Sequence, residues 1–169
     1  LGHHVVCGDV DERKVTMLND GHIPIVEEGL EAIVNESRAA GLLEFVLGAE
    51  AAAEGADIVF LCVPTPQGDD GSADLSYIET AAAQIAPVLR PGAVVVNKST
   101  VPVGSTLAVE RVLQRDDVFV VSNPEFLREG TSIRDYDKPP YTIVGANGEP
   151  ALAALRALFG HLPCELHAT

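Results

Sequence analysis

The sequence predicts an α/β fold: a doubly wound, mainly parallel sheet with helices on both faces. Short, unbroken apolar runs, such as residues 58–63, alternate with longer segments of helical period. Unbroken apolar runs are typical of parallel strands that are covered on both sides. A repeated strand–helix–strand succession favours right-handed crossovers and therefore a parallel sheet. The 169 residues are enough for one domain with a sizeable core.

The elements follow from these patterns in chain order. The expected strands are six apolar runs: residues 4–8, 45–47, 58–63, 93–97, 118–122 and 142–144. Apolar residues at helical spacing mark four helices, over residues 30–34, 78–89, 109–113 and 152–158. Asp74 is the expected N-cap of the second helix. Proline and glycine close several segments, as in Arg90-Pro91-Gly92.

Composition excludes several classes of function. The chain has 11 basic and 25 acidic residues and a net charge of −14, so it repels the phosphates of nucleic acids. No apolar run approaches the roughly 20 residues that span a membrane, and no leader opens the chain, which favours a cytoplasmic location. Cys7 and Cys62 lie in apolar runs and are expected to be small buried side chains. Cys164 lies far from both in the sequence. No cysteine–histidine spacing predicts a metal site.

Ligands of parallel α/β sheets bind where the strands end at their carboxyl edge. The first such exit is "GDVDERK", in which Asp9 precedes Lys14 by five residues. A carboxylate there can accept bonds from both hydroxyls of an adenosine ribose and would repel the 2′-phosphate of NADP, which favours NAD. The alternative is that Asp9 caps the next helix and that Lys14 is solvated. A ribose-binding acid normally follows a glycine-rich phosphate loop by about 20 residues.

The second and third exits carry prolines and hydroxyls. In "VPTPQGDDGS", Pro64 and Pro66 stiffen the chain as it leaves the sheet, and the glycines and aspartates predict an exposed loop. Taken alone, this segment would be interpreted as a plain surface loop and not as part of a binding site. In "NKSTVPVG", Ser99 and Thr100 could bind the nicotinamide ribose or position a water, or they could cap the next helix.

The fourth exit, "SNPEFLREG", contains two carboxylates four residues apart. If the segment turns helically, Glu125 and Glu129 lie on one face and need a ligand, a water or Arg128 to balance their charges. A carboxylate held in such a place can act as a general base. The alternative is a solvated charged turn.

Taken together, these motifs resemble the UDP-glucose and GDP-mannose 6-dehydrogenases, a family of NAD-dependent nucleotide-sugar dehydrogenases. The matching pieces, in order, are "LGHHVVCGDVDERKV", "IPIVEEGLE", "VPTPQGDDGSADLSYIETAA", "NKSTVPVGST" and "SNPEFLREGTSIRDYDKPPYTIVG". The resemblance implies a Rossmann-like NAD-binding domain, a long central helix and a second domain with a catalytic cysteine. It also implies oxidation of the sugar C6 alcohol to a carboxylate by two hydride transfers to NAD, through a cysteine thioester.

The resemblance assigns roles by motif. For the cofactor it implies Asp9 and Lys14 at the adenosine ribose, and Val63, Pro64, Thr65, Pro66, Ser99 and Thr100 along the dinucleotide. Thr100 would also help to place a water, and Glu125 would be the general base for thioester hydrolysis. For the sugar nucleotide it implies contacts from Glu125, Phe126, Leu127, Arg128 and Glu129, with Glu129 also near the nicotinamide.

The departures define the expected domain. The family begins with a strand and a G-x-G-x-x-G loop, and neither precedes Asp9 here; the family's S-C-F-P-K-D cysteine motif is also absent. Residues 1–169 are therefore expected to form an incomplete Rossmann domain without the central helix and the C-terminal substrate domain. The first strand would be central in the 3-2-1-4-5-6 order, so two strands should lack their shared partner. The chain alone is expected to bind NAD poorly and to be inactive.

The substrate and two rival functions stay open. "STVPVG" resembles the UDP-glucose branch, whereas "DYDKPPYTIVG" and "YIET" resemble the GDP-mannose branch; UDP-glucose is preferred because that activity is more widespread. The complete enzyme is expected to be a homo-oligomer. A 3-hydroxyacid or 6-phosphogluconate type dehydrogenase would explain Asp9 but not "NPEFLREG". The alternative from another class is a non-catalytic nucleotide-binding module.

Overall fold

The computed structural model of the chain describes residues 2–68 and 71–169. Helices and strands alternate along it in the following order: β1 (Val5–Asp9), α1 (Glu12–Asn19), α2 (Leu30–Ala39), β2 (Leu43–Leu47), α3 (Ala49–Ala53), β3 (Ile58–Leu61), α4 (Ser76–Ile85), β4 (Val94–Asn97), α5 (Ser105–Leu113), β5 (Phe119–Ser122), α6 (Ser132–Asp137), β6 (Tyr141–Ala146), α7 (Glu149–Phe159) and β7 (Glu165–Ala168). The alternation is the one that the apolar runs predict.

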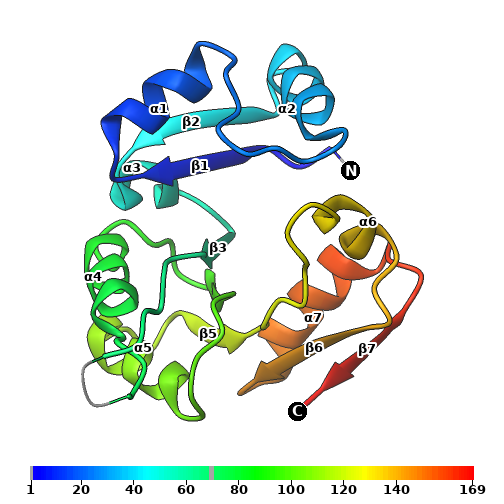
Figure 1. The fold of residues 1–169 in the computed structure, drawn as a ribbon. Helices are drawn as coiled ribbons and strands as arrows, with labels where there is room; N and C mark the ends of the chain where they lie inside the picture. Colours follow the sequence, from blue (N-terminus) through cyan, green and yellow to red (C-terminus); the bar gives the residue numbers. More distant parts are fainter. Residues whose placement is uncertain (1, 69–70) are drawn as a thin grey trace.

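The strands form two sheets (Figure 1). β1 pairs in parallel with β2, with Val5 opposite Leu43. The second sheet has the order β3-β4-β5-β6-β7, and all its pairs are parallel except β5–β6. The mainly parallel, doubly wound α/β architecture is therefore confirmed, with one antiparallel pair that the sequence did not indicate.

The core lies on both faces of the five-stranded sheet. All four residues of β4 are buried. Val95 packs with α4 and α5, whereas Val94 and Val96 pack with Leu155 of α7 on the other face. Burying a side chain of this size contributes roughly 1.5–3 kcal/mol. This two-sided burial explains why the strand appears in the sequence as an unbroken apolar run.

All six predicted strands are present, with ends that differ by a few residues. The short helices α3 and α6 were not predicted, because five or six residues are too few to show a helical period, and α1 was not among the four predicted helices. The strand β7 was not predicted because three of its four residues are exposed. The N-cap of α4 is Leu75, not Asp74. The Asp74 carboxylate instead accepts a hydrogen bond from the amide of Ser76, one position from the predicted arrangement.

Among the described residues β1 pairs only with β2 and β3 only with β4, so each has an open edge, as do β2 and β7. The large apolar side chains Val5 on β1 and Phe60 on β3 are 45% and 38% exposed. Cys7 and Cys62 are also exposed, so the prediction that both are buried is wrong. Its physical reason is that each cysteine lies on or directly after an edge strand.

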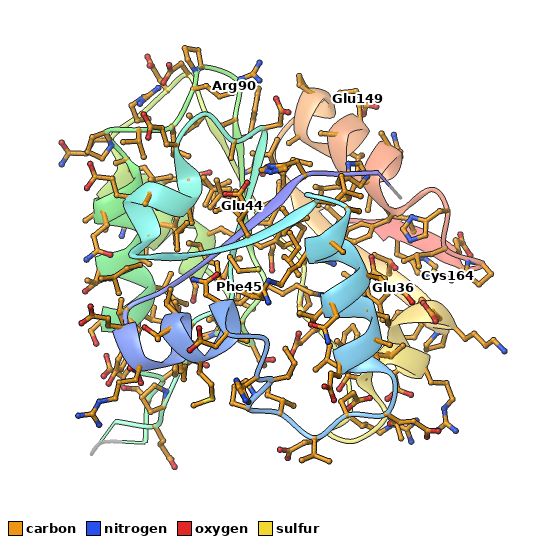
Figure 2. All side chains as sticks on the ribbon, turned by 90° about the horizontal axis from the view of Figure 1, so that it is seen from above. Glu36, Glu44, Phe45, Arg90, Glu149 and Cys164 are labelled. Carbon is orange, nitrogen blue, oxygen red and sulfur yellow. The ribbon has the colours of Figure 1, made fainter. Side chains whose placement is uncertain are left out.

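Side-chain bonds hold the helices to the smaller sheet. Figure 2 views the molecule from the side of β1 and β2 and shows Phe45 on β2. The side-chain amide of Asn19, at the end of α1, donates to the Phe45 carbonyl over 3.1 Å.

None of the helices within the described residues has the length and hydropathy to cross a bilayer. Asp69 and Asp70, in the loop predicted after Pro66, lie outside the described residues.

Candidate functional site

The exit of β1 presents Asp9 as an ionised acceptor. Its Oδ1 accepts the amide of Asp11 at 2.9 Å, and its Oδ2 pairs with the Lys14 ammonium at 3.2 Å. The Asp11 amide, and to a smaller degree Lys14, lower the pKa of Asp9. The N-cap of α1 is Asp11, whose side chain accepts from Arg13, so the capping alternative for Asp9 is wrong. Asp9 and Lys14 form one half-exposed pair at the sheet edge.

The exits of β3 and β4 are joined by two hydroxyls. Ser99 Oγ donates to the Val63 carbonyl over 2.6 Å, and Thr65 Oγ1 donates to the Thr100 carbonyl over 3.1 Å. The N-cap of α5 is Gly104, without a side-chain bond, so neither Ser99 nor Thr100 caps that helix. The structure thus brings together the two segments that the sequence assigned separately to the cofactor.

The exit of β5 is anchored by Asn123 and continues as an irregular loop. The Asn123 amide donates to the Asn97 carbonyl at 2.9 Å, and its side-chain Nδ2 donates to the Ile143 carbonyl at 2.8 Å. Residues 123–128 are not helical, so Glu125 and Glu129 do not share a helical face, as the sequence analysis had considered. Pro124 restricts only Asn123 before it, and the path of the segment is fixed by the side-chain bond of Asn123 to Ile143 and by the bond of the Arg128 amide to Asp135. Both carboxylates are exposed.

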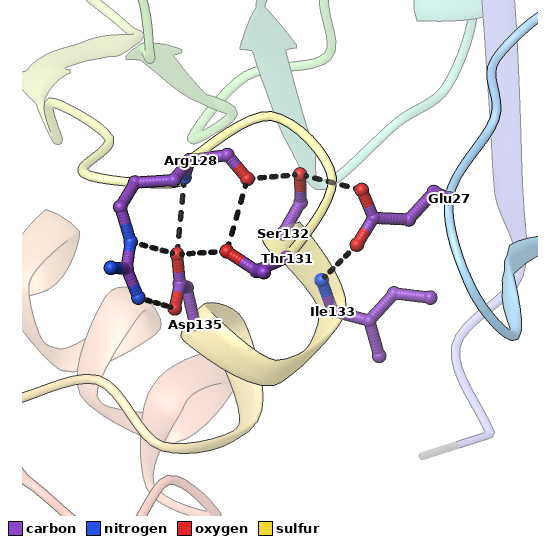
Figure 3. Close-up of polar contacts among 6 residues, drawn as sticks. All are labelled: Glu27, Arg128, Thr131, Ser132, Ile133 and Asp135. Atoms are coloured by element: carbon purple, nitrogen blue, oxygen red, sulfur yellow. Dashed lines mark hydrogen bonds and ion pairs between the residues drawn. The ribbon is translucent and has the colours of Figure 1, made fainter.

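Arg128 is paired within this loop. Its Nε and Nη2 donate to the Asp135 carboxylate over 2.9 Å and 2.7 Å, and its backbone amide donates to the same group (Figure 3). The Arg128 guanidinium holds the pKa of Asp135 well below its usual range. The charge of Arg128 is therefore balanced by Asp135 and not by Glu125 or Glu129.

Lys98 lies between the predicted segments, at the end of β4. Burial lowers the pKa of its ammonium, and the Glu125 carboxylate opposes this shift. Burial by the surrounding atoms raises the pKa of the Cys62 thiol although the residue surface is exposed, and Glu125 raises it further. A thiol held in its protonated form is a poor nucleophile. Lys98 was not predicted as a site residue, although a lysine directly after a buried strand was a signal for it in the sequence.

A cavity of about 310 Å³ extends from Lys98 along the β5 exit to the start of β6. Its wall includes Glu125, Phe126, Leu127 and Tyr141. The Phe126 and Tyr141 rings meet edge to face, with their centroids 5.6 Å apart. The cavity thus includes four of the five residues assigned to the sugar nucleotide, among them Arg128, whereas Glu129 does not line it. Tyr141 was not predicted, because its sequence neighbours resemble a turn.

The site therefore has two regions that meet at Lys98 and Glu125. One consists of strand exits from both sheets, with Asp9 at the end of β1 and with Val63–Pro66 and Ser99–Thr100 after β3 and β4, and the other is the cavity. The strand exits supply groups that fit the ribose and nicotinamide ends of NAD. The sequence contains no G-x-G-x-x-G loop for the pyrophosphate. The residues present thus fit part of the dinucleotide.

The sequence of this chain is similar to those of known dehydrogenases. Residues 1–163 match the domain described as "UDP-glucose/GDP-mannose dehydrogenase family, NAD binding domain". A UDP-glucose 6-dehydrogenase of Rhizobium meliloti is 46% identical over 158 residues, which are 90% of this chain and 36% of that protein. A GDP-mannose 6-dehydrogenase of Pseudomonas aeruginosa is 40% identical over 155 residues, 85% of this chain and 36% of that protein.

Solved structures agree. A UDP-glucose dehydrogenase from Pyrobaculum islandicum superimposes with a TM-score of 0.94 at 36% identity, covering 99% of this chain and 41% of that one. A ternary complex of GDP-mannose dehydrogenase from Pseudomonas aeruginosa gives a TM-score of 0.92 at 35% identity, with the same coverage. The chain thus spans about two fifths of these proteins. The predicted family, fold and NAD cofactor are confirmed: this chain belongs to the NAD-binding domain of the UDP-glucose/GDP-mannose dehydrogenase family.

Proposed function

We propose that this chain forms the cofactor-binding part of a nucleotide-sugar 6-dehydrogenase, with UDP-glucose as the first candidate substrate and GDP-mannose as the second. The observation that supports it is the convergence of three strand exits. Ser99 and Thr65 join the β3 and β4 exits, and Lys98 approaches Glu125 of the β5 exit. A parallel sheet binds its ligands at this edge.

Each side chain has a role in this proposal. Bound NAD would supply the hydride acceptor. Asp9, ionised and half-exposed at the end of β1, accepts hydrogen bonds from ribose hydroxyls, with Lys14 beside it. Val63, Pro64, Thr65, Pro66 and Ser99 form the wall along the dinucleotide. Rigid segments of this kind hold a reacting centre in place, which lowers the entropic barrier.

Hydrolysis of an acyl intermediate needs a base and a positioned water. Glu125 is exposed at the mouth of the cavity, and Lys98 lies near its carboxylate. We assign Glu125 as the general base and Thr100 as the residue that helps to place the water. Glu129 lies further along the loop and is proposed to contact the nicotinamide.

The cavity fits a nucleotide sugar in its chemistry. Phe126 and Tyr141 offer aromatic faces, Leu127 an apolar surface, and Lys98 and Lys138 positive charge for a diphosphate. Arg128 lines the same cavity, but Asp135 already engages Nε and Nη2 of its guanidinium, so its proposed contribution is a contact from the outer side of that group. We prefer UDP-glucose because the relative with 46% identity acts, by its name, on that sugar nucleotide.

The test is to express the complete polypeptide that contains this sequence and to follow NADH formation with UDP-glucose and GDP-mannose in parallel. We expect two NADH per sugar nucleotide and a higher kcat/KM with UDP-glucose. Preference for GDP-mannose would support the second candidate. No NADH with either sugar, together with measurable NAD binding, would favour the non-catalytic module. We also propose that the complete protein is cytoplasmic. We further propose that it is a homo-oligomer, and size-exclusion chromatography with light scattering would check its oligomeric state.

A further inference from the structure

Glu27 contacts α6 from a segment more than a hundred residues away in the sequence. It is half-buried in the loop between α1 and α2. Its Oε1 accepts the backbone amide of Ile133 at 3.3 Å, and its Oε2 lies 3.3 Å from the Ser132 hydroxyl (Figure 3). The N-cap of α6, Thr131, makes no capping bond with its side chain. Glu27 therefore satisfies a helix-end amide that local residues leave unpaired.

The contact reaches the loop that lines the cavity. Ser132 Oγ also lies 3.1 Å from the carbonyl of Arg128, and its single proton is shared between that carbonyl and Glu27 Oε2, so the hydroxyl lies between Glu27 and the end of that loop. Thr131 Oγ1 lies 3.1 Å from Asp135 Oδ2, the same oxygen that accepts from Arg128 Nε. The end of the loop is thus part of a continuous polar cluster whose outer member is Glu27.

The loop is consequently fixed at both ends. At its start, Asn123 is bonded to the Asn97 and Ile143 carbonyls. At its end, the cluster holds Arg128 against α6. The four residues between these anchors include Glu125, Phe126 and Leu127, which line the cavity. The two segments also lie side by side at Gly29 and Ile133. Ile133 Cδ1 is 3.9 Å from the position that a Cβ atom on Gly29 would occupy.

We propose that Glu27 is a positioning residue: it fixes the 124–128 loop, and hence the nucleotide-sugar cavity, from the loop that precedes α2. This inference rests on the proposed function. Glu27 has no hydrogen bond or ion pair with the β3 and β4 exits among the described residues, so its effect should fall on the sugar nucleotide and not on NAD. The neighbouring Glu28 is exposed and takes no part in the cluster, which makes it a matched control.

The kinetic test uses the complete polypeptide. Glu27→Ala is expected to raise the KM for the sugar nucleotide about tenfold, the loss expected from about one net charge-assisted hydrogen bond, and to leave the KM for NAD at the value of Glu28→Ala. Glu27→Gln should restore most of the affinity, because its amide can accept from Ile133 and donate to Ser132. Equal rises in both KM values, or none relative to Glu28→Ala, would overturn the proposal.

A second readout does not depend on activity. Hydrogen–deuterium exchange of peptides covering residues 124–134 should be faster in Glu27→Ala than in Glu28→Ala, with exchange elsewhere unchanged. Ser132→Ala, which removes one of the two contacts, should give a smaller change in the same peptides and serves if Glu27→Ala does not fold. Exchange equal to that of the control overturns the role of Glu27. If the complete polypeptide oxidises neither sugar, the proposed function fails, and exchange still decides the role of Glu27.

Discussion

Asn123 connects the fold with the candidate site, and its replacement by alanine tests that connection. The residue is 2% exposed and directly precedes Pro124 and Glu125. Its side-chain Nδ2 donates to the Ile143 carbonyl over 2.8 Å and so ties the β5 exit to β6. Asn123→Ala removes this bond but keeps the backbone bond to Asn97, so the expected effect comes from the side chain alone.

The magnitude follows from that bond. Losing a short hydrogen bond to a carbonyl in a buried place costs about 1–3 kcal/mol. Asn123 Oδ1 is buried without a hydrogen-bond partner among the described residues, so its deletion recovers part of this cost. We therefore expect a loss of about 1–2 kcal/mol in the free energy of unfolding. For a domain of this size that lowers the melting temperature by roughly 2–8 °C.

Scanning calorimetry of the complete polypeptide would measure this change in the transition of the NAD-binding domain. The exposed Asn147 offers a matched control, since Asn147→Ala removes the same amide from a turn. Asn123→Asp should be more destabilising than Asn123→Ala at pH 7, because a buried carboxylate cannot donate to Ile143. If Asn123→Ala melted within 1 °C of Asn147→Ala, the reasoning about the β5 exit would be refuted.

Three further predictions concern the site. Glu125→Gln should lower kcat by about 10²–10⁴-fold in the NADH assay and leave the KM for NAD unchanged, as removal of a general base requires; unchanged turnover would contradict the assignment. Burial lowers the pKa of Lys98 in the folded state. Its charge therefore destabilises the fold at pH values below this folded-state pKa. The cost disappears as the pH rises through the pKa of the unfolded state, which is near 10.4. Lys98→Met should therefore raise the melting temperature at pH 7 but not above about pH 11, while kcat/KM falls roughly tenfold; a lower melting temperature at pH 7 would contradict this. The 169-residue chain alone should show weak NAD binding by calorimetric titration and no NADH formation, and measurable turnover would contradict the expectation.

The fold could be predicted from the sequence where burial dictates residue type. β4 appears as an apolar run because both of its faces are covered, by α4 and α5 on one side and by α7 on the other. β7 could not be predicted, because only Leu166 of its four residues is even half-buried and three are exposed. The exposure of Cys7 and Cys62 depends on which strands lie beside theirs. Apolar residues do not encode that by themselves.

The sequence indicated individual residues of the candidate site but not how they lie relative to one another. The motifs indicated Thr65, Ser99 and Thr100, yet the bonds that join them span 35 and 36 residues of sequence. The helical interpretation of Glu125 and Glu129 failed because the loop is held by Ile143 and Asp135, which lie later in the sequence. Glu27 was visible only as part of "IPIVEEGLE", because its partners are more than a hundred residues away.

The open edges of β1 and β3 bear on how the two regions of the site are held together. Asp9 lies at the end of β1, and the Val63–Pro66 segment follows β3, but no ladder joins these strands among the described residues. Their relative position depends instead on contacts of α3 with β1 and α4. A dinucleotide that binds Asp9 at one end and Thr100 at the other must span both sheets. Its affinity should therefore depend on how rigidly they are held, and a strand paired with both edges would stiffen that connection.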